Sequence, residues 1–327
     1  MKKIYLIMAA TVVVSAACSK TEAPKSTNEV KTISVKMAEL QNDDETKTEL
    51  APLDGIYKKL VWSATDKIYV STTGEITAKG GQSFTYSTYT LYSGSGTTEA
   101  TFTGLSPAGT GKYVAVYTGA CDYDVLNEVI LFTKNDTYFQ AAIPVNQTYV
   151  ENGIAQYAMP MYACGADLDN LSFKLMGNVL RFNLYNGDGG KVIKIKSIKL
   201  TAGGEMKSRG IAGPFAIEVA ELESGIDNVF GIWNVNGTSA KGSDHVNYSC
   251  GDGVLLSTDP GKPTAFNVVI SRTRPTNEEP ITARFTYNVD GGADTYKDIV
   301  LTNLNQTKRL ALGKIYTFTP AQNVASW

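Results

Sequence analysis

Near the middle of the chain, residues Leu171–Tyr185 read LSFKLMGNVLRFNLY, and both halves of the sequence can be interpreted outward from this segment. From Leu171 to Leu175, apolar residues alternate with polar ones, which is the period of a half-buried β-strand. Gly177 and Asn178 interrupt the run, and the apolar positions then change phase, as they do at a bulge or tight turn. A polar break, Gly165–Asn170, lies just upstream. We therefore predict one β-rich unit before this segment and a second that opens with it.

The composition supports sheets joined by turns. A length of 327 residues fits two ordinary domains, and a hydrophobic share of 43% is enough for their cores. Only 19% of residues are charged, while Gly and Tyr are abundant, which favours strands over salt-bridged helices. The net charge of −2 gives no electrostatic reason to expect nucleic-acid binding. His245 is the single histidine, so a multi-histidine metal site is excluded within one chain, and we expect no metal and no cofactor.

Short alternating segments recur along both halves. Ile33, Val35 and Met37 predict a first strand, and the polar stretch Gln41–Glu49 follows it as a loop. Residues 60–70 predict a pair of strands or one bent strand. Further strands are expected at Tyr113–Tyr117, at Val192–Leu200 with a phase change near Ser197, at Phe266–Ile270, and on either side of an Asp290-Gly291 hairpin turn. Many short strands separated by turns are typical of β-sandwiches.

The amino terminus has the pattern of a secretory signal peptide. Lys2 and Lys3 precede the apolar run Ile4–Val14, which is too short to span a bilayer. Ser15-Ala16-Ala17 then lead to Cys18 and resemble a bacterial lipobox. We therefore predict a signal peptide at 1–17, lipidation of Cys18, and a flexible polar tether over 18–29. The alternative is ordinary cleavage near Ala17, with Cys18 an unmodified residue.

The sequence carries no catalytic motif, and we predict that the protein is not an enzyme. His245 follows Ser243 and Asp244, but the nucleophile motif GxSxG is absent. Among the four cysteines, Cys121 and Cys164 fall in the first half and are either bridged or free thiols; the sequence does not distinguish the two.

Several short segments, taken in their order along the chain, resemble segments of the fimbrillin-like proteins, which are type V pilus subunits of Gram-negative anaerobes. VWSATDKIYV (Val61–Val70) resembles the Trp-then-Asp-Lys strand phrase of that family, and ATFTGL and YVAVY continue it. MPMYA followed by LSFKLMGNVLRFNL resembles the join between domains, and IKSIKLTAGG, IAGPF and LALGKIYTFT complete the pattern. The match covers residues 28–319.

The resemblance implies two tandem transthyretin-like Greek-key β-sandwiches, which we place at 30–166 and 167–327. It also implies assembly by donor-strand exchange: proteolysis frees the first strand, and a strand from another subunit enters the groove. On this sequence the displaceable strand carries Ile33, Val35 and Met37, and the cut falls after Lys47. The family usually has Arg there, whereas this chain has no Arg before Arg181.

The function expected from the resemblance is a structural or accessory fimbrial subunit of tip or anchor type, involved in adhesion and lipid-anchored at the outer membrane surface. Its partners would be other fimbrial subunits, the outer membrane, and a host or glycan ligand. The tail after Thr319 is short for a donor strand. The alternative is a monomeric surface lipoprotein that binds glycans, supported by the aromatic content and by Trp233 in an expected loop, whereas Trp62 has the phase of a core residue.

Overall fold

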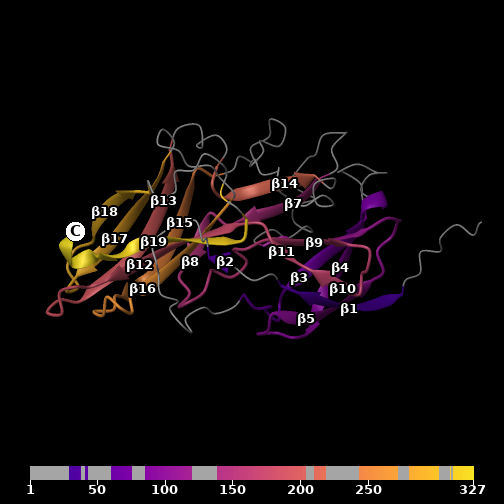
Figure 1. Cartoon of the computed structure of the whole chain (residues 1–327), viewed down its shortest axis with the longest axis horizontal. Helices are drawn as coiled ribbons and strands as arrows, with labels where there is room; N and C mark the ends of the chain where they lie inside the picture. The colour runs from indigo at the N-terminus through magenta and orange to yellow at the C-terminus, as the bar shows by residue number, and fades with distance from the viewer. Residues whose placement is uncertain are drawn as a thin grey trace, which may run out of the picture.

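The computed structural model describes residues 29–37, 41–42, 60–75, 85–119, 138–203, 210–218, 243–271, 280–301, 310 and 312–327. Over these ranges the regular structure is β apart from single helical turns, so the all-β prediction is confirmed. Figure 1 shows the strands in two parts side by side along the longest axis, with β1 in one part and the C-terminus at the far end of the other.

The first part is an eight-stranded sheet whose two ends lie next to each other. Its order is β10-β1-β5-β4-β3-β6-β9-β11, and only Phe173 separates the first of these strands from the last, so the sheet curls round on itself. Trp62 lies inside, 1% exposed, with its ring edge-on to Phe102, Tyr117 and Phe173. The strands are β1 (Val30–Lys36), β3 (Lys67–Thr72), β4 (Ser87–Ser93), β5 (Glu99–Leu105), β6 (Tyr113–Tyr117), β9 (Met161–Gly165), β10 (Asn170–Ser172) and β11 (Lys174–Leu175).

The second part is a sandwich of two sheets. One has the order β16-β12-β19-β2 and the other β18-β17-β13-β15-β8. Their inner faces meet where the rings of Phe182 and Phe285 lie 5.2 Å apart. The strands are β2 (Gln41–Asn42), β8 (Asn146–Thr148), β12 (Asn178–Tyr185), β13 (Ile193–Ala202), β15 (His245–Leu255), β16 (Thr264–Ile270), β17 (Ile281–Val289), β18 (Thr295–Val300) and β19 (Lys314–Asn323).

The two parts are joined by more than one chain crossing. β7 (Tyr138–Ile143) pairs with β14 (Gly213–Glu218) in a two-stranded ribbon that lies between them in Figure 1. The short strands β2 and β8 come from the first half of the sequence, yet they pair with β19 and β15 in the second sandwich. Buried side chains of both parts accordingly form one continuous hydrophobic cluster.

The central segment passes from one part to the other at Gly177. β11 belongs to the curled sheet and β12 to the sandwich, which explains why the apolar positions change phase between them. A Cβ at Gly177 would lie 3.1 Å from Met159 Sδ and 3.2 Å from the Ile270 carbonyl oxygen, so the passage is tight. The predicted division at 166–167 stays a prediction, and the strand pairing favours a join at residues 176–177, since β10 and β11 both follow residue 167.

Other local predictions have clear outcomes. The phase change in β13 is confirmed as a bulge between Ile195 and Ser197. The hairpin turn is confirmed, with positive φ angles of 53° at Asp290 and 72° at Gly291. Of the pair of strands or single bent strand expected over residues 60–70, the part with Leu60, Trp62 and Ala64 is wrong, because β3 begins only at Lys67. A turn forms there instead, because Asp66 N–H donates to the Ser63 carbonyl (3.0 Å) while the Asp66 carboxylate accepts from Ser63 N–H (2.7 Å).

A buried amide completes the edge of one sheet of the sandwich. Gln147, 2% exposed, donates from Nε2 to the Val269 carbonyl (2.7 Å) and accepts on Oε1 from Val269 N–H (2.9 Å). β16 is the first strand of its sheet, so the side chain satisfies backbone groups that a neighbouring strand would otherwise satisfy. This contact fixes β8, which comes from the first half, against the second sandwich.

Replacing Gln147 by Leu should lower the free energy of unfolding by about 2–5 kcal/mol, because the N–H and C=O of Val269 would both lose a buried partner. The matched control is Asn146→Ala, which removes an exposed amide contact with Asn247 and should change stability by about 0.5 kcal/mol or less. Denaturant unfolding measures both. Equal effects of the two variants would contradict the assigned role of Gln147.

Candidate functional site

β1 lies between β5 and β10 in the curled sheet. It pairs antiparallel with β5 along its whole length, from Val30 opposite Leu105 to Lys36 opposite Glu99. On its other side it pairs parallel with β10 over only three residues. Two further hydrogen bonds hold that side: Ser34 N–H donates to the Asp169 carbonyl (3.1 Å) and Phe173 N–H to the Lys36 carbonyl (2.8 Å). We call this position, between β5 and β10, the β1 seat.

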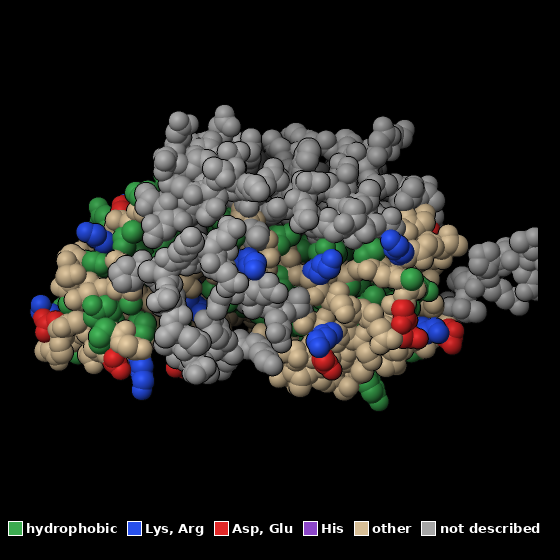
Figure 2. Space-filling model, viewed as in Figure 1, with side chains coloured by type: hydrophobic (Ala, Val, Ile, Leu, Met, Phe, Trp, Pro, Cys, Tyr) green, Lys and Arg blue, Asp and Glu red, His purple; other side chains and the backbone are tan. Residues whose placement is uncertain are grey.

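The inward face of β1 is apolar and fully buried. Ile33, Val35 and Met37 are 0%, 2% and 5% exposed, so the three residues predicted for the displaceable strand point together into the core. On the outward face, Lys36 forms an exposed ion pair with Glu99 at 3.3 Å, a contact of little energetic weight. Figure 2 shows charged side chains scattered over the described part of the visible face rather than gathered by sign. Apolar burial and backbone pairing therefore hold β1 in place.

The strand beside the seat is fixed by its own polar turn. The Asp167 carboxylate accepts hydrogen bonds from Asn170 Nδ2 (2.8 Å) and from Asp169 N–H (2.9 Å). These bonds hold the pKa of Asp167 below its usual value. The turn fixes the start of β10 through bonds within residues 167–170, in addition to the bond that the Asp169 carbonyl accepts from β1, so this wall of the seat has support of its own.

A cavity of about 180 Å³, partly open to solvent beside the exposed side chains of Val61 and Val150, lies at the C-terminal end of β1. Met37 lines it, together with side chains from the first part and from the loop between β8 and β9, among them Leu60, Tyr117, Ile154, Ala155 and Met161. The loop joins both parts: Asn267 Nδ2 of β16 donates to the Gly153 carbonyl at 2.8 Å, and the hydroxyls of Tyr157 and Thr65 are 2.7 Å apart. Tyr157 holds a left-handed φ of 59°.

One carboxylate, Asp66, forms part of the cavity wall. It is 4% exposed and accepts from Ser63 N–H at 2.7 Å and from the Tyr117 hydroxyl at 3.2 Å. Burial raises the pKa of Asp66 despite these two bonds, which act in the opposite direction. Asp66 and Tyr117 are thus bonded to groups of the protein itself, and the rest of the cavity wall is mainly apolar.

The C-terminal tail is built into the second sandwich. β19 runs parallel to β12, and the Phe318 ring stacks on Phe182 at 4.9 Å. After it, Val324 is buried and the Trp327 ring contacts Phe285 (5.2 Å) and Tyr287 (5.6 Å). The expectation of a short tail after Thr319 is thus refined, since these residues continue a strand and end in a short helical turn.

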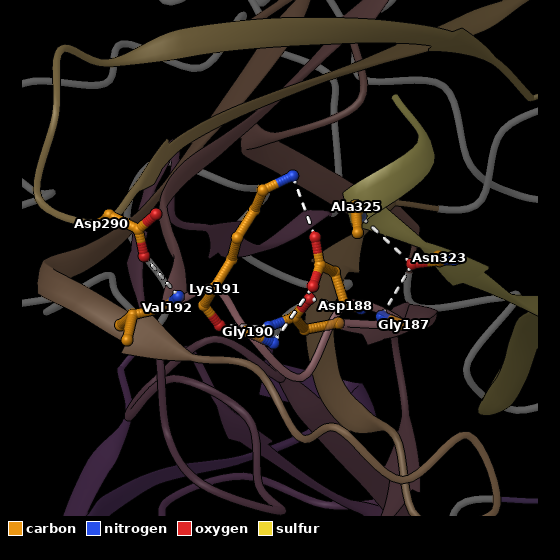
Figure 3. A network of polar contacts seen from close by, with 9 residues as sticks. Gly187, Asp188, Gly190, Lys191, Val192, Asp290, Asn323 and Ala325 are labelled. Atoms are coloured by element: carbon orange, nitrogen blue, oxygen red, sulfur yellow. Dashed lines mark hydrogen bonds and ion pairs between the residues drawn. The ribbon is translucent and has the colours of Figure 1, made fainter.

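Polar contacts lock the tail to a neighbouring loop, as Figure 3 shows. Asn323 Oδ1 accepts from Gly187 N–H (2.8 Å) and from Ala325 N–H (3.1 Å). The same loop is closed by an ion pair between Asp188 and Lys191 at 2.9 Å. The segment Gly187–Lys191 is therefore a structural loop that holds the C-terminus in place.

Ser243, Asp244 and His245 do not form a catalytic relay. The Asp244 carboxylate lies 2.8 Å from His245 Nδ1, and Ser243 Oγ lies 3.2 Å from the same nitrogen. A triad needs the acid and the nucleophile on opposite ring nitrogens, so that one orients the ring while the other gives up its proton. Within the described ranges, no group of three or more side chains is arranged to hold a metal ion.

Several predicted site residues fall outside the described residues: Cys18, Lys47, Cys121 and Trp233. Cys164 lies half-buried in β9, and Cys121, its predicted partner in one of the two alternatives, is outside the described ranges. Trp62 is confirmed as a core residue. The described residues include no helix long and apolar enough to cross a membrane. The sequence analysis did not predict the cavity or the hydrogen bond between Asp66 and Tyr117. The one sequence feature that marks this region is the order Trp-x-x-x-Asp at Trp62 and Asp66, just before β3.

No family model matches the sequence, and no curated protein matches it. Among solved structures, the fold is similar to a candidate cell adhesion protein from Bacteroides uniformis, at 14% identity over 89% of this chain and 92% of that one, with a TM-score of 0.36. It is also similar to the tip fimbrial protein Mfa3 from Porphyromonas gingivalis, at 12% identity over 82% of each chain, with a TM-score of 0.32.

A third similar structure is a fimbrial assembly protein from Parabacteroides distasonis, at 8% identity over 88% of this chain and 90% of that one, with a TM-score of 0.34. Each is a likeness, and none assigns a role to this chain.

The raised pKa of Asp66 predicts a defined pH dependence. A carboxyl whose folded pKa lies above its unfolded value stabilises the fold at low pH, and this contribution is lost as the pH rises through the folded pKa. Relative to Asp66→Asn, the wild-type chain should therefore gain stability as the pH falls from 7 toward about 4.

Asp298 supplies a control of opposite sign, because its bonds to Arg284 at 2.7 Å lower its pKa. Relative to Asp298→Asn, the wild-type chain should lose stability over the same range. Denaturant unfolding at several pH values measures both differences. A wild-type advantage over Asp66→Asn that shrinks on acidification would refute the burial argument.

Proposed function

We propose that the protein is a cell-surface fimbrial subunit of tip or anchor type, which accepts a strand from another subunit in the β1 seat. The observation that carries the proposal is the seat itself. One strand near the start of the chain fills it, pairing with β5 over seven residues and burying three alternating apolar side chains. An extended segment from a partner with the same alternation would satisfy the same backbone groups and the same pockets.

The energetics favour replacement of β1 over simple loss. Burying each of Ile33, Val35 and Met37 contributes about 1.5–3 kcal/mol. A domain has only about 5–15 kcal/mol of net stability, so an empty seat would be unstable and prone to pair with any free strand. Exchange is therefore expected to proceed with the incoming strand entering as β1 leaves.

The fixed C-terminus supports an accepting role over a donating one. A donor needs a free strand, whereas here β19 pairs with β12 and Trp327 packs on Phe285. Withdrawing the tail would open the second sandwich. We therefore expect this chain to end or begin a fimbrium rather than to polymerise alone.

Two parts of the proposal concern residues outside the described ranges. Lipid on Cys18 would anchor the chain at the outer membrane surface, and proteolysis after Lys47 would separate β1 from the rest of the chain. After such a cut, the contacts that hold β1 among the described residues would be those of its seat and those of β2 with β19. A protease that tolerates Lys is needed.

The test uses a mature chain with a site-specific protease sequence inserted after Lys47. Once cut, this chain should incorporate a labelled peptide of residues 29–37, EVKTISVKM, and the exchange should appear by native mass spectrometry. The uncut chain is the first control. The second is a peptide with Asp at the position of Ile33, which should not enter because it places a charge in a buried pocket.

Failure of the cut chain to exchange would contradict the acceptor mechanism. Long homopolymers of the cut chain, seen by sizing chromatography, would contradict the tip or anchor role while leaving the exchange mechanism in place.

A further inference from the structure

We infer that the partner strand carries an aromatic side chain at the register of Met37, and that the cavity at the end of the β1 seat receives it. The inference rests on the proposed function and names the chemistry of its partner. The observation behind it is that the β1 side chains leave space unfilled at the end of the β1 seat. The Met37 side chain is 5% exposed and lies against a cavity of about 180 Å³.

The cavity is continuous with the seat. Met37 N–H donates to the Thr98 carbonyl at 2.9 Å, so the sheet pairing extends to this residue. Its side chain follows Ile33 and Val35 on the inward face, because alternate residues of a strand share a face. A strand entering in the register of β1 would bring one side chain directly to the cavity.

The volume suits a ring. An apolar protein cavity of about 150 Å³ is large enough to bind benzene. The cavity beside Met37 has a comparable volume and is partly open to solvent, so a ring in place of the flexible thioether has room to enter and gains contacts with the apolar lining. A shorter side chain at this register would leave more of the space empty.

The lining suits an aromatic group. Most of the lining side chains are apolar, and the thioethers of Met159 and Met161 make favourable contacts with aromatic rings. The Tyr117 ring offers an edge or face at 8% exposure. Asp66, the one acid in the wall, is already bonded to Ser63 and Tyr117, so it imposes no cation on the ligand.

This arrangement would favour the partner strand over β1 in the exchange. The built-in strand holds the seat with Met37, and a partner strand with an aromatic residue there would hold it better. The chain would thus be folded before assembly and would still prefer its partner afterwards.

The experiment compares three labelled peptides of residues 29–37 with Met, Phe or Ala at the register of Met37, each added to the chain cut after Lys47. The Phe peptide should dissociate at least ten-fold more slowly than the Met peptide, and the Ala peptide faster than both. In an Ala155→Leu chain, where a longer side chain takes up part of the cavity, the advantage of Phe over Met should disappear.

A second arm uses the uncut chain and needs no exchange. Met37→Phe should raise the denaturation midpoint, whereas Ile33→Phe should lower it, because Ile33 is 0% exposed and does not line the cavity. If peptides bind with equal lifetimes whether they carry Met or Phe, the aromatic inference is wrong while strand exchange stands. If no peptide binds, the proposed function fails, and Met37→Phe alone decides whether the cavity accepts a ring: a lowered midpoint overturns the inference.

Discussion

The first part of the protein depends on β1 being in its seat. Three inward side chains of one short strand complete a core that also contains Trp62, and the same strand satisfies the backbone of β5 and β10. The two ends of the curled sheet lie side by side at Phe173, so the sheet is almost closed. β1 is therefore an interior strand with a neighbour on each side, and not an edge strand. Under the proposed function, β1 is the strand at which another chain joins this one.

The C-terminal residues are fixed within the second part. Its sandwich is completed by β19 and by the ring of Trp327, and Asn323 ties this tail to the loop at Gly187. β2 and β8, which come from the first half of the sequence, are also paired there. The two parts share one hydrophobic cluster, so the buried face of the β1 seat belongs to a core that continues into the second part.

Much of the fold could be predicted from the sequence, because period-2 alternation is a local property of strands such as β1, β12 and β13. The phase change at Gly177 was visible, but its cause, a passage between sheets, depends on distant pairing. The buried strand face of Ile33 could be predicted for the same local reason. The cavity beside Met37 could not, because a void depends on how side chains from several elements fail to meet, and no residue pattern records that.

The central claim is that β1 is held as a separable unit. Hydrogen exchange of the backbone amides, measured by mass spectrometry before and after a cut beyond Lys47, tests it most directly. In the uncut chain, β1 should be as protected as β5, its partner along seven residues. After the cut, β1 and the amides of β5 and β10 that face it should exchange together and faster, while β12 and β19 keep their protection. Protection of β1 that is unchanged by the cut, or loss of protection throughout the chain at once, would contradict the account.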